Sequence, residues 1–121
     1  MSPHLSIYQP QITWYGSITN RITGSLLSGG LYVFAVAYLV APTVGWHLES
    51  AALAASFGAL PLALKLITKV VVAWPFAYHA LNGVRHLAWD VGLGFKTKTV
   101  QRTGWAVAGL SVVSAVALAF V

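Results

Sequence analysis

The stretch that decides the fold is LITKVVVAWPFAYHALNGVRHLAWD, residues 66–90. Its first half is almost entirely apolar. Its second half holds two of the four histidines of the chain, an arginine and one of only two acidic residues. A long apolar segment is typical of a membrane-spanning helix, and an ionisable side chain within such a helix usually has a function. Fold and site are therefore predicted from the same segment.

The composition supports a membrane protein. Of the 121 residues, 58% are hydrophobic and 7% are charged, whereas a soluble domain carries about 25% charged residues. The length allows one domain, residues 1–121. The net charge of +5 does not indicate nucleic-acid binding, because apolar runs separate the basic residues and no basic face forms. These residues are interpreted as charges that flank membrane segments.

The chain contains no cysteine. This excludes disulfides, thiolate-bound iron–sulfur clusters, covalently attached c-type haem and a cysteine nucleophile. The sequence also has no glycine-rich phosphate loop and no dinucleotide fingerprint. Any redox centre would therefore be held by histidine or by a partner chain.

Three transmembrane helices are predicted in an all-α integral membrane fold, preceded by an inner-side segment of residues 1–22. The helices are expected at residues 23–41, 61–90 and 103–121. The second has a charge-free centre of fifteen residues, 70–84, or roughly 22 Å of helix. Snorkelling of Lys65 and Lys69 makes up part of the missing length. Pro75 is expected to bend this helix.

The connections predict the orientation. The first, residues 42–59, contains no Lys or Arg, whereas the second, residues 91–102, contains three. The positive-inside rule places the second connection on the cytoplasmic or matrix side. With three spans, the N-terminus lies on that same side.

The polar residues of the second helix form a stripe. At 100° per residue, His79, His86 and Asp90 share one face with Gly83, whereas Arg85 lies on a different face. His86 and Asp90 are equally well explained as polar residues near the membrane surface. His79 lies deeper, where an ionisable side chain is interpreted as functional.

A neutral imidazole in hydrocarbon needs a partner for each nitrogen, and haem iron would supply one for His79. Gly83, one turn away, leaves room for a flat macrocycle. His79 and His86 cannot both bind one haem, since they lie on one side of one helix. They are about 10 Å apart, too far for one metal ion without further ligands. The consistent solution is one axial ligand here and one from another chain, which predicts a membrane partner.

A second group of polar residues lies at the start of the first helix. Ser17 and Arg21 are four residues apart and share one helix face. One interpretation makes Ser17 a helix N-cap and Arg21 a snorkelling anchor. The other makes both residues hydrogen-bond donors to a ligand carbonyl or to haem propionates. The spacing is consistent with both.

Three motifs, in order, carry a resemblance. They are SPHLSIYQPQITWYGSITNRITG (residues 2–24), HALNGVRHLAWD (79–90) and KTKTVQRTGWAV (96–107). Together they resemble the cytochrome b large membrane-anchor subunit of succinate dehydrogenase, mitochondrial complex II. The similarity covers nearly the whole chain, and the N-terminal motif is most similar to the fungal branch.

The resemblance implies roles for individual residues. His79 would be an axial ligand of haem b, with the second ligand supplied by the small anchor subunit. Arg21 and His86 would lie near the haem propionates, and the role of Asp90 is less defined. The ubiquinone pocket would be lined by Trp14, Ser17, Ile18 and Arg21.

One position departs from the family pattern. The family usually has histidine before the arginine of the first helix, whereas this chain has Asn20. Asparagine can donate a hydrogen bond but carries no charge. A contact to a haem propionate is therefore expected to be weakened or lost here.

The implied complex also contains an iron–sulfur subunit and a flavoprotein subunit, and it belongs to the tricarboxylic acid cycle and the respiratory chain. This chain would be a non-autonomous enzyme subunit without flavin, iron–sulfur centre or catalytic residue of its own. Its expected location is the mitochondrial inner membrane with the N-terminus in the matrix, as a processed mature form, or a bacterial inner membrane. The alternatives are a haem-free structural anchor and the anchor of a fumarate reductase.

Overall fold

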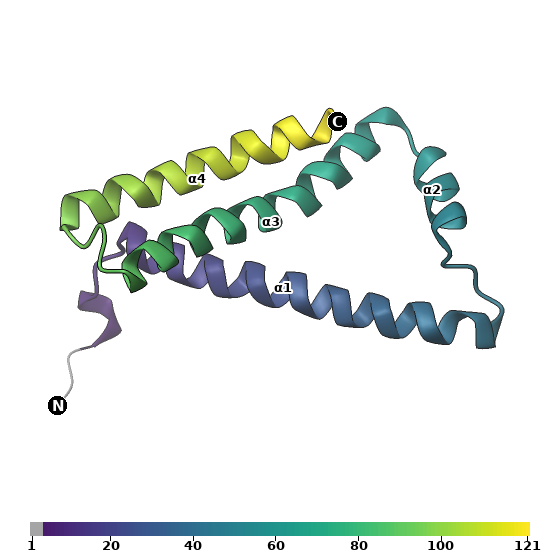
Figure 1. Ribbon diagram of the computed structural model, residues 1–121, viewed down its shortest axis with the longest axis horizontal. Coiled ribbons are helices and arrows are strands. Elements are labelled where there is room, and N and C mark those ends of the chain that lie inside the picture. The colour runs from purple at the N-terminus through teal and green to yellow at the C-terminus, as the bar shows by residue number, and fades with distance from the viewer. Residues whose placement is uncertain (1–3) are drawn as a thin grey trace.

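Three long helices dominate the computed structural model, which describes residues 4–121 (Figure 1). They are α1 (Ile12–Val40), α3 (Leu62–Asp90) and α4 (Thr97–Ala119). The expected all-α fold is confirmed, since residues 4–121 form no strand. Shorter elements connect or precede the long helices: the 3-10 turns η1 (Leu5–Ile7) and η2 (Ala41–Val44), and the helix α2 (Ser50–Gly58).

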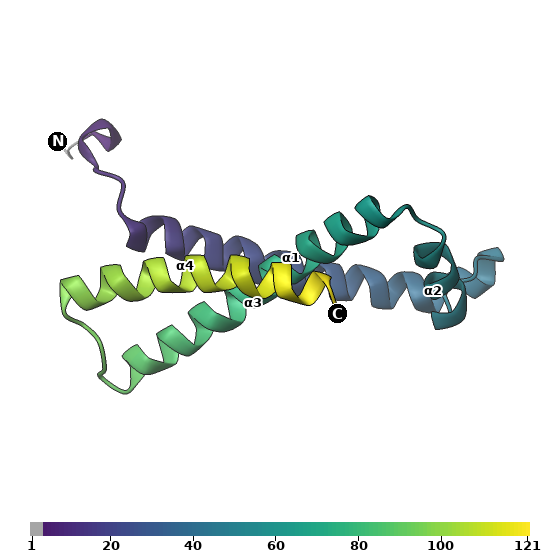
Figure 2. The ribbon, with the colours of Figure 1, turned by 90° about the horizontal axis from the view of Figure 1, so that it is seen from above.

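The long helices make a layer that is closed at one end and open at the other. α4 packs along α3, and this is the most extensive contact between elements. α1 crosses α3 where Gly16 and Asn20 of its first turns contact Tyr78 and His79 near the middle of α3, and the two helices then diverge (Figures 1 and 2). α2 lies between the separated ends of α1 and α3 (Figure 1). The site residues on α1 and α3 therefore meet where the two helices cross.

The buried interior is small and partly polar. Its apolar members are mostly alanines, and Asn82, Thr23 and Ser111 are the largest side chains with almost no exposed surface. Large apolar side chains face outward along all three long helices, as Leu31 at 66% and Val113 at 65% exposure illustrate. Small and polar contacts between helices with apolar residues outside are typical of helices that pack within a membrane.

Two helices begin earlier than predicted. α1 begins at Ile12 rather than at residue 23, and α4 at Thr97 rather than at residue 103. The predicted boundaries followed hydropathy, which marks where a helix would enter hydrocarbon. A helix itself begins where its backbone hydrogen bonds begin, and both helices extend into polar sequence. Half of the predicted inner-side segment 1–22, residues 12–22, is thus part of α1, and its first three residues lie outside the described ones.

The prediction for α3 was close, since residues 61–90 were expected and Leu62–Asp90 are helical. The helix is continuous through Pro75. The helix α2 was not predicted, because it lies in the segment interpreted as the outer connection. It is alanine-rich, SAALAASFG, and alanine has the highest intrinsic helix propensity. None of its residues is buried.

Two of the three predicted spans have the length and composition to cross a membrane. They are the stretch Ile12–Val44 and helix α4, Thr97–Ala119. α3 is 29 residues long, but Lys65, Lys69, Asn82 and Arg85 lower its apolar content. The middle span, α3, therefore stays a prediction.

Candidate functional site

The imidazole of His79 rests on α1. Its Nδ1 lies 3.1 Å from the backbone oxygen of Asn20 and 3.5 Å from Oγ1 of Thr23. Thr23 is 2% exposed, and its hydroxyl lies 2.8 Å from the backbone oxygen of Thr19. One turn of α1 therefore surrounds one edge of the His79 ring.

Gly24 allows this close approach. A Cβ added at Gly24 would lie 2.7 Å from Cε1 and 3.2 Å from Nδ1 of His79. Any larger residue would push the imidazole away from α1 or separate the two helices. Only a glycine fits at position 24 with His79 in this place.

The contact with Asn20 also determines which nitrogen of His79 carries hydrogen. A carbonyl oxygen only accepts hydrogen bonds, so Nδ1–H donates and the neutral imidazole has its lone pair on Nε2. Among residues 4–121, Nε2 has no hydrogen-bond partner, and it is not a fully buried atom. Histidines that bind metals commonly donate their other N–H to a backbone carbonyl in this way. The ring is thus suited to be a ligand through Nε2.

The space beside His79 is open. A Cβ at Gly83, one turn further along α3, would meet nothing within 4 Å. The described part of the chain has no group of three or more His, Cys, Asp or Glu residues that could hold a metal ion. A free metal ion is therefore a poor fit here, whereas a flat group with its own metal and one protein ligand from this chain fits the donor set.

The predicted polar stripe on α3 does not come together as one site. His86 and Asp90 are exposed, and the ring of His86 lies against Trp89 with 4.9 Å between ring centres. Neither residue contacts His79. The crossing of α1 covers only the deep end of that face, so His79 contacts α1 whereas His86 and Asp90 stay exposed.

The predicted quinone residues of α1 lie on its outer side. Trp14 and Ile18 are 47% and 45% exposed, Arg21 is exposed, and Ser17 is partly exposed. Their spacing of three, four and seven residues places all four on one helix face. Gly16 and Thr23, on the opposite face, are buried against α3. The interpretation of Ser17 as an N-cap is wrong, because α1 begins at Ile12 with Gln11 as its N-cap.

The backbone oxygen of Asn20 has a hydrogen-bond partner, whereas its side-chain oxygen has none within residues 4–121. Its backbone oxygen accepts from His79, whereas its Oδ1 is buried without a partner in residues 4–121. Position 20, where the sequence departs from the family pattern, therefore lies beside His79 in the structure.

Arg85 is the main residue that the sequence analysis undervalued. It is 8% exposed, and it lies between α3 and α4. Its Nε donates to Oγ1 of Thr103 at 3.1 Å and its Nη2 to the backbone oxygen of Val100 at 2.9 Å. Nη1 donates to Oδ1 of Asn82 at 3.2 Å, and the guanidinium lies 4.2 Å from the ring centre of Trp89.

The spacing of Asn82, Arg85 and Trp89 in the sequence indicates a role in helix packing. Asn82 and Trp89 lie three residues before and four residues after Arg85, on the same helix face. Arg85 has no acidic partner in residues 4–121, where Glu49 is hydrogen-bonded to His47. The site also contains Tyr78, buried on the α1 side, whose hydroxyl donates to the backbone oxygen of Gly16 at 3.1 Å.

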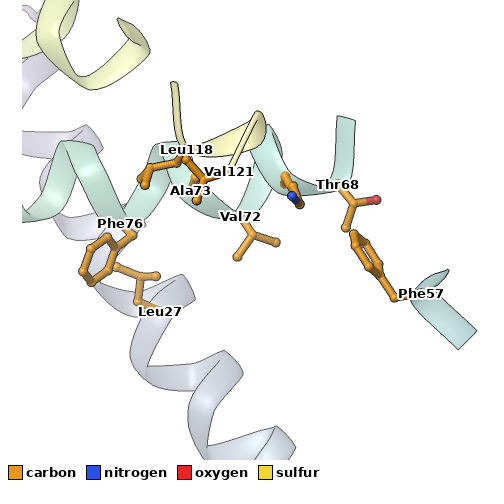
Figure 3. Close-up of a pocket in the computed structure, with 9 residues that line it drawn as sticks. Leu27, Phe57, Thr68, Val72, Ala73, Phe76, Leu118 and Val121 are labelled. Carbon is orange, nitrogen blue, oxygen red and sulfur yellow. The ribbon is translucent and has the colours of Figure 1, made fainter. Parts of the chain in front are cut away.

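An apolar cavity lies apart from all of these residues. It has a volume of about 700 Å³, and Figure 3 shows the residues that line it. Its walls are almost wholly apolar and come from all four α-helices, including Leu27, Phe57, Val72 and Leu118. None of the predicted site residues lines it.

Comparisons with known proteins agree with the motifs. The family described as succinate dehydrogenase/fumarate reductase transmembrane subunit matches residues 1–118. The mitochondrial succinate dehydrogenase cytochrome B subunit of Schizosaccharomyces pombe is 46% identical over 113 residues, which is 93% of this chain and 63% of that protein. The chain thus spans less than two thirds of that fungal relative.

A bacterial and a mammalian relative are similar over most of the chain. The succinate dehydrogenase cytochrome b556 subunit of Rickettsia bellii is 39% identical over 119 residues, covering 97% of this chain and 87% of the relative. The mitochondrial succinate dehydrogenase cytochrome b560 subunit of Mus musculus is 37% identical over 119 residues, covering 98% and 69%.

Proposed function

The chain belongs to the family of succinate dehydrogenase/fumarate reductase transmembrane subunits, and from this membership we propose that it is a membrane-anchor cytochrome b subunit of succinate:ubiquinone oxidoreductase. It forms a single membrane domain and half of an anchor bundle, whose other half is the small anchor subunit. The outward-facing apolar side chains of the three long helices support this, since they need lipid or a partner. The iron–sulfur and flavoprotein subunits complete the complex.

The proposed location is the mitochondrial inner membrane with the N-terminus in the matrix. The relatives from Schizosaccharomyces pombe and Mus musculus are both named as mitochondrial, and Lys96, Lys98 and Arg102 at the start of α4 favour that orientation. The Rickettsia relative makes a bacterial inner membrane the alternative.

His79 is the proposed axial ligand of haem b. The observation that carries this proposal is the bond from Nδ1 to the backbone oxygen of Asn20, which leaves the lone pair on Nε2 available. The haem would be shared with the small anchor subunit, which supplies the second ligand. When bound, haem b supplies one-electron redox chemistry. Arg21 and His86 are proposed to lie near its propionates.

The outer face of α1 is the proposed wall of the ubiquinone site. The Ser17 hydroxyl and the Arg21 guanidinium orient one quinone carbonyl and stabilise the negative charge that develops on it. Ile18 and Trp14 provide an apolar surface for the ring. Reduction takes two electrons, from the iron–sulfur subunit, and two protons from the aqueous side. The exposure of these side chains supports the proposal, because a site completed by partner subunits must be open in this chain alone.

The haem assignment is tested by a reduced-minus-oxidised optical spectrum of the purified complex, with His79→Ala beside wild type. A b-type signal that disappears or shifts in His79→Ala supports the assignment. If the intact wild-type complex shows no b-type signal, the chain is a haem-free anchor with a quinone site.

The quinone assignment is tested with Ser17→Ala and Arg21→Ala. Both should depress succinate-driven quinone reduction and leave electron transfer from succinate to an artificial acceptor largely intact. Equal loss of both activities would indicate an assembly defect instead. An anchor of a fumarate reductase is the second candidate, since the family description includes both enzymes, and the ratio of the two directions of catalysis distinguishes them.

A further inference from the structure

One peptide group connects the two proposed sites. The oxygen that accepts from His79 belongs to Asn20, and its carbonyl carbon is bonded to the backbone nitrogen of Arg21. Within this single planar unit, the carbonyl contacts the proposed haem ligand and the amide belongs to the proposed quinone residue. The hydrogen bond joins residues 59 positions apart in the sequence.

The contact around this peptide leaves little freedom for movement. Gly24 lies so close to the Cε1–Nδ1 edge of the imidazole that an added Cβ would be 2.7 Å from Cε1. Thr23 lies on the same edge, with Oγ1 3.5 Å from Nδ1 and 3.1 Å from the Asn20 oxygen. If α1 shifts or rotates at Arg21, the acceptor of the His79 N–H moves with it.

We propose that the Asn20–Arg21 peptide couples quinone binding on the outer face of α1 to the His79 imidazole, with Thr23 and Gly24 as positioning residues. This inference rests on the proposed function of both sites. A ligand that moves Arg21 changes the length of the Nδ1–H···O bond. That bond sets how basic Nε2 is, and the basicity of a histidine ligand tunes the electronic properties of its metal.

The proposal predicts a spectroscopic response. In the fully oxidised complex, where no electrons are available to reduce quinone, adding decylubiquinone should shift the Soret band of the haem. Gly24→Ala forces the imidazole away from α1 and should reduce the amplitude of this shift about two-fold or more. It should also raise the haem midpoint potential, because a weaker Nδ1–H···O bond makes Nε2 less basic.

Matched controls separate this effect from a general disturbance of α1. Gly30→Ala adds the same methyl group on the same helix, where nothing lies within 4 Å, and it should retain the wild-type shift. Asn20→Ala removes the side chain but keeps the backbone oxygen, so decylubiquinone should still shift the Soret band of this variant. If Gly24→Ala does not assemble, Thr23→Val is the second variant, since it removes only the hydroxyl beside Nδ1. Its control is Thr43→Val, which removes an exposed hydroxyl.

The outcomes are distinguishable. The first case is a wild-type complex that contains haem and reduces quinone, and that loses the haem in His79→Ala. If decylubiquinone does not shift the Soret band of that complex, the coupling is wrong and the proposed function stands. An equal shift in wild type, Gly24→Ala and Thr23→Val also overturns the coupling. If the wild-type complex contains no haem, or His79→Ala keeps a wild-type haem spectrum, the proposed function itself fails.

Discussion

His79 and Arg85 lie six residues apart on α3, and the chain treats them in opposite ways. Arg85 is satisfied within the chain, since it donates to Asn82, Thr103 and Val100 and stacks on Trp89. His79 is satisfied on one side only, with Nδ1 bonded to α1 and Nε2 without a partner in residues 4–121. Arg85 therefore holds α3 and α4 together, whereas His79 keeps one nitrogen, Nε2, free to bind a metal.

This difference teaches how to separate structural from functional polar residues in a membrane helix. Burial alone would select Arg85, which is 8% exposed, ahead of the half-buried His79. The useful criterion is whether the hydrogen-bonding capacity is used up inside the chain. Arg85 should therefore affect stability, and His79 should affect haem content.

Arg85→Ala is expected to have the largest effect. It removes three hydrogen bonds and leaves the buried Oδ1 of Asn82 unpaired, which should cost about 3 kcal/mol or more. The measurement is the thermal dissociation midpoint and yield of the detergent-solubilised complex. Haem per assembled complex should stay unchanged, in contrast with His79→Ala. Loss of haem from fully assembled Arg85→Ala complex would contradict the comparison.

Gly104→Ala should have the next largest effect on stability. Its Cβ would lie 3.1 Å from Ile12 Cγ1 and 3.5 Å from Arg85 Nη2, so α1 or the arginine must move, at about 1–2 kcal/mol. Gly109→Ala is the matched control on the same helix, because nothing lies within 4 Å of its Cβ position. Equal dissociation midpoints for the two variants would mean that the Ile12–Gly104–Arg85 contact is not tight.

Tyr78→Phe tests the contact between α1 and α3. It removes the hydrogen bond from the hydroxyl to the Gly16 oxygen and should destabilise the complex by about 1 kcal/mol. Tyr32→Phe is a suitable control, since Tyr32 is 71% exposed. A dissociation midpoint as high for Tyr78→Phe as for Tyr32→Phe would show that water replaces the lost bond.

His86→Ala should have the smallest effect. The side chain is exposed and stacks only on Trp89, so assembly and haem content should match wild type. If His86 lies near a haem propionate, as proposed, the haem midpoint potential should shift slightly, and a redox titration measures this. Loss of haem in His86→Ala would mean that His86 is needed to retain the haem and does more than lie near a propionate.

Several features could be predicted from the sequence because they are local. The helix Leu62–Asp90 followed from the long, largely apolar segment that begins after Pro61. The shared face of Trp14, Ser17, Ile18 and Arg21 follows from helical spacing. The starts of α1 and α4 were missed, because hydropathy reports the membrane boundary and these helices extend beyond it. Helix α2 was not predicted, because its residues lie in the segment that was interpreted as the outer connection.

The role of Arg85 could not be predicted from its own helix. Helical periodicity correctly separated it from the His79 face, but the partner on that other face is Thr103, in the next helix. The surroundings of the polar stripe could not be predicted for the same reason. Periodicity grouped His79 with His86 and Asp90, but the crossing of α1 covers only the first of them.

The sequence by itself determined that this is a helical membrane protein, that its family is that of the succinate dehydrogenase anchors, and that His79 is the histidine to examine. Composition and helical spacing carry the membrane class and the choice of His79, and the resemblance of three sequence motifs carries the family, because all of these are local properties of the chain. The tertiary structure decided which nitrogen of His79 is engaged, why position 24 is glycine and where Arg85 finds its partners. Those answers depend on distances between helices far apart in sequence, and they emerge only when the helices pack.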